Sequence, residues 1–356
     1  MAAIESTINR AAVYADPGNS LRTEILETPI PVPGHGEVLV RLSHSGVCHT
    51  DIGFCLNLFD VVPEPTPKGQ VGGHEGVGVV VKQGEGVSYP AIGSTVGISY
   101  AADACLSCEN CLQGGETTCT ASKISGYFTP GTFQQYVVAP ARYVIPIPQN
   151  LDPAMAAPLM CGGLSVYAAL KRATVRPGGW VVVCGGGGGL GHLGIQYAKA
   201  MNGRVLALDT DVKRQVCLDV GADAFLDFAA YDEPQSLAAE IISTTGGGAS
   251  VVLMCTSSSR AYGQAMSWLG FRGTLACLGI PKENLLVPRV IDMIGKELRI
   301  IATKAGNRLE AQECLQIAAQ GGIKVHTQLR RMDELTQVFE ELESGEIQGR
   351  AVIDLA

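Results

Sequence analysis

Two cysteines and one histidine stand in short motifs that are far apart in the sequence. Cys48 begins the segment Cys-His-Thr-Asp, His74 lies in Gly-Gly-His-Glu-Gly, and Cys161 is followed by two glycines. Two thiolates and one imidazole, with a fourth position left open, form the ligand set of a catalytic zinc ion. Taken singly, His74 is also typical of a hydrogen-bonded loop histidine, and Cys161 of a buried core thiol. The motifs together favour a metal site.

A second group of thiols is much denser. Its members, separated by two, two and seven residues in a glycine-rich polar segment, are Cys105, Cys108, Cys111 and Cys119. Four thiolates suit a closed, tetrahedral structural zinc site. An iron–sulfur cluster also uses short Cys-x2-Cys spacings, but the wide last gap and the absence of a proline after Cys119 disfavour the bacterial ferredoxin pattern. We expect a structural zinc ion here.

A run of glycines follows an apolar, strand-like segment that ends at Cys184. The residues expected to bind a cofactor in this turn are Gly185, Gly186, Gly188, Gly189, Leu190 and Gly191. Such a turn lets the backbone approach a pyrophosphate at a helix N-terminus. The next strand ends at Asp209, 18 residues after Gly191, where an acid accepts hydrogen bonds from both ribose hydroxyls. The pattern predicts NAD(H) binding, while Lys213, a further candidate cofactor contact, and Arg214 keep NADP(H) open.

The segments that must position these residues change in character near residue 162. Before it, short β segments such as 37–42 and 76–81 alternate with Gly and Pro. After it, apolar strand-like segments alternate with helical patterns, at 180–183, 204–208, 224–226, 250–254, 273–278 and 298–301. This alternation predicts an α/β domain with a doubly wound parallel sheet. Beyond about residue 306, one helix and a closing strand at 350–353 are expected to return to the first domain.

The composition bounds the class of protein. A chain of 356 residues with 46% hydrophobic and 17% charged residues is long enough for two globular domains. A net charge of -8 argues against nucleic acid and anionic membrane surfaces as partners. The first residues lack a secretory pattern, and no run approaches about 18 consecutive apolar residues, so we expect no membrane span. Several of the 12 cysteines lie in metal-like motifs, which favours a reducing compartment and a cytoplasmic protein.

Together the motifs resemble those of the zinc-dependent medium-chain alcohol dehydrogenases, and most closely the fungal, yeast-type branch. The resemblance covers essentially the whole chain. Its segments, in order, are Gly-Val-Cys-His-Thr-Asp at 46–51, Val-Gly-Gly-His-Glu-Gly at 71–76, the four-cysteine segment, Phe-Gln-Gln-Tyr at 133–136, Cys-Gly-Gly-Leu-Ser-Val-Tyr at 161–167 and Gly-Gly-Leu-Gly at 188–191.

The resemblance implies a role for each matching residue at the catalytic metal. Cys48, His74 and Cys161 match the zinc ligands, and Glu75 matches an acid beside the metal that we count among its candidate ligands. Asp51 matches the carboxylate that hydrogen-bonds the ligand histidine, which fixes its tautomer and raises its basicity. Sorbitol-type relatives usually have a glutamate at the position of Cys161, so the cysteine favours an alcohol or aldehyde over a polyol.

Other matches concern the substrate and the cofactor. Thr50 matches the hydroxyl that takes the substrate proton. Tyr100 falls where the family has an aromatic wall, and we expect Thr50, Tyr100 and Phe54 to line the substrate pocket. His49 and Arg350 match groups that contact the cofactor pyrophosphate.

The family's architecture is carried over in the same way. It implies a GroES-like, β-rich catalytic domain at 1–161 and 300–356 and a Rossmann NAD-binding domain at 162–299, with the active site in the cleft between them. It also implies two zinc ions per chain. The chain lacks the long insertion found near the structural zinc of the vertebrate dimers, which implies a homotetramer.

One position departs from the family pattern. The proton relay usually ends in a histidine three residues after the hydroxyl residue, and here that position is Gly53. Glycine cannot carry a proton, so the proton must leave through water or another group, for which His49 is a candidate by proximity. The following segment, 55–68, also differs from the yeast pattern, which admits either a bulkier substrate or ordinary loop drift.

We therefore expect a zinc-dependent oxidoreductase that transfers a hydride between NAD(H) and a small-molecule alcohol, aldehyde or ketone. The alternatives are a specialised reductase of a bulky carbonyl in a biosynthetic pathway, and a quinone or enoyl reductase that needs no zinc. A non-enzymatic binding protein and a zinc-ribbon interaction module are disfavoured, because the candidate ligands, Thr50 and the glycine turn are all present.

Overall fold

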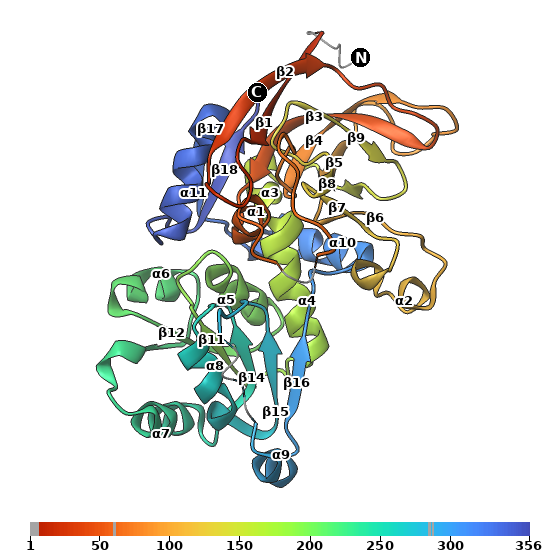
Figure 1. The fold of residues 1–356 in the computed structure, drawn as a ribbon. Coiled ribbons are helices and arrows are strands. Elements are labelled where there is room, and N and C mark those ends of the chain that lie inside the picture. The colour runs from red at the N-terminus through yellow and green to blue at the C-terminus, as the bar shows by residue number, and fades with distance from the viewer. Residues whose placement is uncertain (1–6, 60–61, 284–285, 287) are drawn as a thin grey trace. The chain divides into compact units, whose positions relative to one another are not determined.

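The computed structural model describes residues 7–59, 62–283, 286 and 288–356, and the chain divides into two compact units (Figure 1). The first unit consists of Met1–Cys161, Asn307–Ala319 and Val325–Ala356, and the second of Gly162–Gly306 and Gln320–Lys324. The boundary expected at residue 300 needs correction. It falls inside a strand, Arg299–Ala302, whose hydrogen bonds to the neighbouring strand keep it in the second unit.

Strands dominate the first unit. They are β1 (Ile8–Tyr14), β2 (Thr23–Pro29), β3 (Glu37–Gly46), β4 (Gly76–Gln83), β5 (Thr95–Ile98), β6 (Ala101–Asp103), β7 (Lys123–Ser125), β8 (Phe128–Thr129), β9 (Tyr136–Pro140), β10 (Ile145–Pro146), β17 (Thr327–Arg331) and β18 (Arg350–Asp354). Seven of them form one sheet in the order β10-β5-β4-β3-β18-β17, with β9 also paired to β3. Its pairs are antiparallel except for β17 and β18, which are parallel.

Short helices close the core of this unit. They are α1 (His49–Cys55), α2 (Glu109–Leu112), α3 (Pro153–Pro158), α10 (Arg308–Ile317) and α11 (Leu335–Glu343). Leu335, Val338 and Phe339 recur at helical spacing on α11 and are fully buried in the same core as Val40 of β3 and Ile52 of α1. The strand β3 is thereby fixed on its core face, which also fixes α1 directly after it.

The second unit contains the six strands β11 (Trp180–Cys184), β12 (Arg204–Asp209), β13 (Ala224–Asp227), β14 (Ala249–Met254), β15 (Leu269–Cys277) and β16 (Arg299–Ala302). They form one parallel sheet in the order β13-β12-β11-β14-β15-β16. The order reverses between β11 and β14, which is the switch point at which such sheets bind ligands. The doubly wound parallel sheet predicted from the sequence is confirmed.

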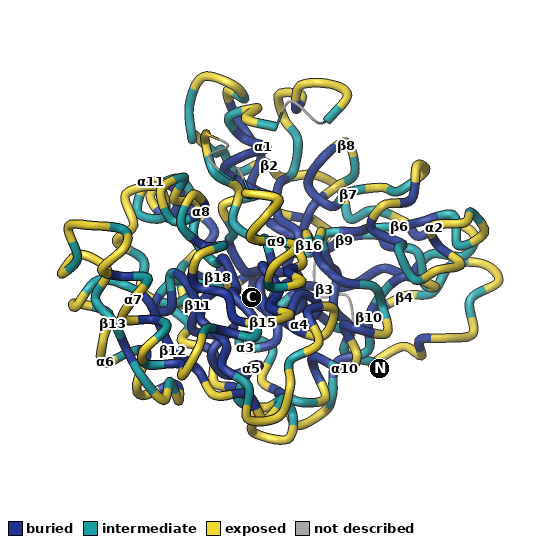
Figure 2. The backbone as a smooth tube through the Cα atoms, turned by 90° about the horizontal axis from the view of Figure 1, so that it is seen from below, coloured by how far each residue is buried: buried dark blue, intermediate teal, exposed yellow. Residues whose placement is uncertain are grey.

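Helices cover both faces of this sheet. They are α4 (Leu164–Ala173), α5 (Gly191–Ala200), α6 (Arg214–Asp219), α7 (Pro234–Thr245), α8 (Ser259–Ala265) and α9 (Val290–Lys296). Val182 belongs to the core cluster that contains Ile241 of α7, whereas Val183 points the other way, toward Gly194 of α5. Burial on both faces explains the nearly continuous apolar strands, and Figure 2 shows β11 and β12 as buried tubes.

One helical stretch, Pro153–Ala173, is long and apolar enough to cross a membrane by length and composition alone. Its mean hydropathy is 1.4, but 78% of the window is buried inside the fold, as in a core helix. The stretch includes α3, a π-helical turn at Leu159–Gly163 and α4. The division between the two units falls within that turn.

Candidate active site

The first candidate ligand lies where β3 passes into α1. Cys48 is the N-cap residue of the helix, and its backbone N–H donates to Asp51 Oδ2 at 2.9 Å while the Asp51 N–H donates to the Cys48 carbonyl at 3.0 Å. An acid at this position satisfies an orphan donor of the helix start. Thr50 follows in the same turn, with its Oγ1 3.7 Å from the Cys48 Sγ. The local sequence thus orients thiol and hydroxyl together.

His74 and Glu75 arrive from the turn before β4. Gly73 has a φ of +93°, a conformation that side chains rarely adopt. A Cβ on Gly46 would overlap the Glu75 carboxylate, so glycine at the end of β3 makes room for that side chain. The other oxygen of Asp51 lies 2.8 Å from His74 Nδ1, and both side chains are fully buried. Asp51 therefore links the helix start to the imidazole.

Cys161 completes the group from the π-helical turn Leu159–Gly163. Such turns are rare and occur often at functional sites. The four ligand atoms, from Cys48, His74, Glu75 and Cys161, all lie within 4.8 Å of one another. Three segments that are distant in sequence therefore converge on one small volume inside the first unit.

The chemistry of this group fits a metal ion. His74 donates through Nδ1 to Asp51, and its buried Nε2 has no hydrogen-bond partner among the described residues. Burial lowers the pKa of the His74 imidazole, but the negative charge of Asp51 and its hydrogen bond outweigh this effect and raise the pKa well above its usual value. A hydrogen bond from the Cys161 thiol lowers the pKa of Cys48 well below the ordinary thiol value. The same hydrogen bond raises the pKa of Cys161 well above that value. An orphaned imidazole nitrogen beside a thiolate suits zinc.

Arg350 lies at the same group but makes a contact that the sequence did not indicate. Its Nη2 lies 2.6 Å and 2.7 Å from the two Glu75 oxygens and donates to the Val47 carbonyl at 3.1 Å. The pairing of β18 with β3, in which Val352 opposes Gly46, brings the arginine there. Burial raises the pKa of Glu75 to about 7 although Arg350 opposes the shift. The predicted pyrophosphate contact of Arg350 stays a prediction.

Aromatic rings flank the group on one side. Tyr100 presents its ring edge-to-face to His74, with centroids 5.8 Å apart, and stacks on Phe54 at 6.4 Å. Phe54 is 2% exposed and stacks in turn on Tyr127 at 5.1 Å. Of the two aromatic residues among the predicted pocket residues, Tyr100 thus contacts the candidate ligand His74, while Phe54 packs against Tyr100 from the core.

Gly53, the position that departs from the family pattern, faces another aromatic ring. A Cβ there would overlap the ring of Phe59, which packs edge-to-face on Phe54 at 5.4 Å. The space that a side chain at position 53 would occupy is therefore filled. His49, the alternative exit for the proton, is exposed at the first position of α1.

The dense group of thiols also gathers into one cluster, as its local spacing indicates. The ligand atoms of Cys105, Cys108, Cys111 and Cys119 lie within 4.8 Å of one another. Cys105 Sγ is 3.9 Å from Cys111 Sγ and 3.5 Å from Cys119 Sγ, close to the edge of about 3.8 Å that four sulfurs around tetrahedral zinc require. Backbone N–H groups of Ser107 and Cys108 lower the pKa of Cys105 to about 6. All 12 cysteines of the chain are free thiols.

The glycine turn lies in the second unit, between β11 and α5. Gly185 has a φ of +78°, and a Cβ on Gly191 would overlap the Gly185 carbonyl, so the turn can close only with glycine at both positions. Asp209 at the end of β12 accepts a hydrogen bond from the Gly187 N–H at 2.8 Å. Lys213 packs against Gly187 as well. Asp209 and Lys213 therefore both lie against the glycine turn, at Gly187, and the cofactor contacts of these residues stay a prediction.

Polar residues around the four-cysteine loop escaped the sequence analysis. Glu116 is buried inside the loop and pairs with Arg308 at the start of α10. The distance of 192 residues along the chain hides this pair. A local signal was present nonetheless, because Asn307 and Glu310 have the spacing of a helix capping box, which the structure contains.

Comparisons with known proteins agree with this arrangement. A family model for the alcohol dehydrogenase GroES-like domain matches residues 34–149, and a model for zinc-binding dehydrogenases matches residues 189–320. A relative from Emericella nidulans, alcohol dehydrogenase 2, is 43% identical over 98% of this chain and 97% of its own. The solved acetophenone reductase from Geotrichum candidum in complex with NAD is 28% identical, has a TM-score of 0.84 and covers 99% of this chain and 98% of its own. A thermostable alcohol dehydrogenase from Pyrobaculum aerophilum, solved with cobalt and zinc, is 27% identical with a TM-score of 0.83, covering 98% and 99%.

Proposed function

Because the chain belongs to the zinc-binding alcohol dehydrogenase family, we propose that it transfers a hydride between NAD(H) and an alcohol, aldehyde or ketone. The observation that carries this proposal is the convergence of Cys48, His74 and Cys161 around a buried imidazole nitrogen that has no partner among the described residues. A reductase that uses only the nicotinamide has no need of this group of ligands.

Zinc held by Cys48, His74 and Cys161, with Glu75 beside it, would supply Lewis acidity toward the substrate oxygen. The residues around it have separate tasks. Asp51 holds the proton on Nδ1 of His74, which leaves Nε2 as a lone-pair donor. Thr50, held in the first turn of α1, would relay a proton in oxidation, taking the proton of the substrate hydroxyl while passing its own hydroxyl proton on toward the cofactor ribose; the relay would run in reverse in reduction. We propose a second zinc ion at the four-cysteine loop, which makes two per chain.

The cofactor is held by the second unit. The backbone of residues 185–191 and the N-terminus of α5 bind the pyrophosphate, and a bound nicotinamide supplies or accepts the hydride. Asp209 already has a fixed orientation, because it accepts from the Gly187 and Thr210 N–H groups at 2.8 Å each. Its remaining lone pairs accept from the ribose hydroxyls, and its charge would repel a 2′-phosphate. We therefore propose NAD(H) rather than NADP(H) as the cofactor.

A specialised reductase of a bulky aromatic carbonyl is the second candidate. It is favoured by the stacked rings of Tyr100 and Phe54 beside His74. A flat aromatic substrate packs well against such a wall. Both candidates use the same ligands, the same cofactor turn and the same hydroxyl, so they differ only in the substrate.

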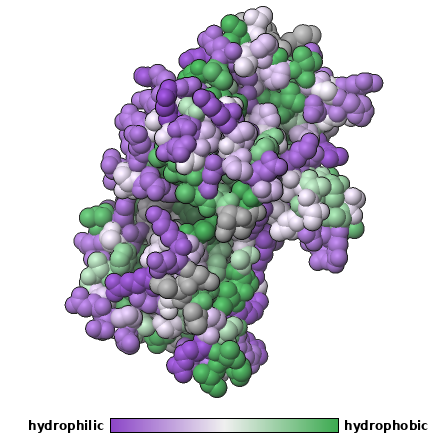
Figure 3. Space-filling model, in the orientation of Figure 1, coloured by the Kyte–Doolittle hydropathy of each residue, from purple (hydrophilic) through white to green (hydrophobic). Residues whose placement is uncertain are grey.

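We further propose a homotetramer in a reducing, cytoplasmic compartment. Support for self-association comes from the second unit, where β16 is the edge strand of the sheet and α9 exposes Val290, Ile291 and Ile294 at 67%, 65% and 68%. Figure 3 shows apolar side chains gathered over α9. Exposed apolar groups next to an open sheet edge are typical of interfaces between copies. The free state of all 12 cysteines supports the compartment.

The proposal is tested by NADH oxidation with a panel of carbonyls, from acetaldehyde to acetophenone-like ketones. NADPH and chelator-treated protein serve as controls, and metal analysis of the purified chain accompanies the assay. We expect chelator-sensitive turnover with NADH, two zinc ions per chain, and no turnover after Cys48→Ala. Turnover confined to large aromatic carbonyls would select the second candidate, and full activity of the Cys48→Ala variant would overturn the metal mechanism.

A further inference from the structure

The helix α10 occupies a special place in the chain. It lies in Asn307–Ala319, which belongs to the first unit but is preceded by Gly306 and followed by Gln320–Lys324 of the second unit. The chain therefore passes from one unit to the other at both ends of this segment. Contacts that hold α10 in place therefore also hold the two points at which the chain passes between the units, before Asn307 and after Ala319.

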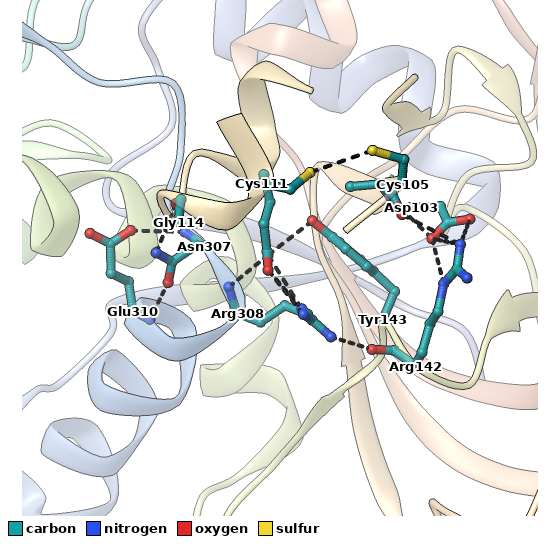
Figure 4. A network of polar contacts seen from close by, with 11 residues as sticks. Asp103, Cys105, Cys111, Gly114, Arg142, Tyr143, Asn307, Arg308 and Glu310 are labelled. Carbon is teal, nitrogen blue, oxygen red and sulfur yellow. Dashed lines mark hydrogen bonds and ion pairs between the residues drawn. The ribbon is translucent and has the colours of Figure 1, made fainter. Parts of the chain in front are cut away.

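The N-terminus of α10 is anchored to the four-cysteine loop by polar contacts (Figure 4). Asn307 Nδ2 donates to the Gly114 carbonyl at 2.9 Å. Arg308 donates to Glu116 from its Nη2 at 2.9 Å and from its backbone N–H at 3.3 Å. Tyr143 also donates its hydroxyl to Glu116, at 3.2 Å. The buried Glu116 carboxylate thus accepts hydrogen bonds from two residues outside the loop, Arg308 and Tyr143.

Both anchor points are one backbone hydrogen bond away from a candidate metal ligand. The Gly114 N–H donates to the Cys111 carbonyl at 3.0 Å, and the Cys119 N–H donates to the Glu116 carbonyl at 3.1 Å. Glu116 also starts a short 3-10 turn, Glu116–Thr118, which leads directly into Cys119. A shift of either cysteine therefore shifts an acceptor of α10.

The loop has little structure of its own to resist such a shift. Its regular elements are α2, with four residues, and the 3-10 turn, with three. The buried cluster beneath it consists of Ala101, Ala104, Cys111, Cys119 and Tyr143, so two of its five members are themselves candidate ligands. A closed four-thiolate metal site supplies folding energy to a segment of this kind.

We infer that Glu116 is a positioning residue that couples metal binding at the four-cysteine loop to the docking of α10. This inference rests on the zinc site proposed for the loop. With the metal bound, Cys111 keeps Gly114 within hydrogen-bond distance of Asn307. Cys119 likewise keeps Glu116 within hydrogen-bond distance of Arg308. Without it the acceptors shift, and the first turn of α10 opens together with the crossing that precedes it.

The test is a two-by-two cycle that combines metal occupancy with the Glu116→Gln substitution. Zinc content is measured first, and Cys111→Ser then removes the loop's metal from an otherwise intact chain. Amide hydrogen exchange of residues 308–314 is followed by mass spectrometry. Glu109→Gln is the matched control, because Glu109 is exposed on α2 in the same loop and accepts only from Gln113 among the contacts described.

We expect Cys111→Ser to speed exchange in the first turns of α10 by at least about tenfold, as loss of charge-assisted hydrogen bonds implies. Glu116→Gln alone should give similarly fast exchange, and adding Cys111→Ser to it should change the rate less than about twofold. The Glu109→Gln control should preserve the full response to Cys111→Ser. If Glu116→Gln fails to fold, Asn307→Ala, which removes the other anchor, should show the same loss of response.

The inference is overturned if the Cys111→Ser and Glu116→Gln effects simply multiply, which a merely structural role of Glu116 would give. It is also overturned if the amide exchange rate of α10 stays the same when the loop loses its metal, or if the loop binds no metal. Cys48→Ala separates this result from the proposed activity, since it should abolish turnover and leave α10 exchange unchanged.

Discussion

Replacing Arg350 by methionine removes one partner of a buried ion pair in the first unit, Arg350–Glu75. The arginine is 5% exposed, and Glu75 is fully buried. Both Glu75 oxygens lie within hydrogen-bond distance of Nη2, at 2.6 Å and 2.7 Å. Methionine fills a similar volume without charge, so the substitution mainly leaves a carboxylate buried without its counter-ion.

The expected loss follows from that uncompensated charge. Breaking a buried pair on one side costs about 3–5 kcal/mol, whereas replacing both partners by uncharged groups is nearly neutral. For a folded unit of this size, each kcal/mol shifts Tm by about 2–4 °C. We therefore expect Arg350→Met to lower Tm by roughly 10 °C, and Glu75→Gln in the same chain to restore most of the loss.

Thermal unfolding of four proteins decides the matter: the parent chain, both single variants and the double variant. Arg331→Met is the control for loss of an arginine, because its pair with Asp333 is exposed to solvent and contributes little to stability. If Arg350→Met behaves like Arg331→Met, or if the double variant is as unstable as Arg350→Met, the reasoning is refuted. The double variant also tests the predicted pyrophosphate contact, since stability should return while the KM for NADH stays raised.

Three further predictions concern other sites. Gly53→Ala should destabilise the chain by about 1–3 kcal/mol, because the added methyl group overlaps the ring of Phe59. In a double-variant cycle, Phe59→Ala should remove much of this loss of stability. Additive effects of the two substitutions would contradict the overlap. Asp209→Asn should lower kcat/KM for NADH by about tenfold or more and lower that for NADPH less, and equal losses with both cofactors would contradict its role at the ribose. Burial raises the pKa of Asp223, but hydrogen bonds from Lys199 and a backbone N–H outweigh it and hold the pKa below its ordinary value of 3.8. The stability that Asp223 contributes is thus fully present above that value and is lost as the pH falls through the lowered pKa. Urea titrations should therefore show Asp223→Asn less stable than the parent chain by about 1 kcal/mol at pH 7, with the difference shrinking as the pH falls below 3.8.

The sequence predicts best those features that depend on neighbours in the chain. The thiols from Cys105 to Cys119 lie within one short loop, so their spacing alone indicates a cluster. The glycine turn is equally local, because Gly191 must lack a side chain to pass the Gly185 carbonyl. The parallel sheet follows from apolar strands that are buried on both faces.

Contacts that depend on tertiary pairing leave no such trace. Glu75 and Arg350 are 275 residues apart, and only the register of β18 on β3 brings them together. The filling of the space beside Gly53 by Phe59 is likewise invisible, since a glycine in a helix has several possible causes. The boundary near residue 300 was misplaced for the same reason, because strand pairing assigns residues 299–302 to the second unit.

The two groups of candidate ligands differ in how they are held, and this difference bears on their roles. At the first group, helix capping fixes Cys48, Asp51 orients His74, and a glycine makes room for Glu75, all through contacts among protein atoms. Such a site binds a metal with little rearrangement and can leave one position open for substrate. At the second group, the thiols form part of their own small core, and the loop reaches the rest of the fold through Glu116. Metal removal should therefore leave the first group in place while the second loosens, which is the behaviour expected of a catalytic and a structural site, respectively.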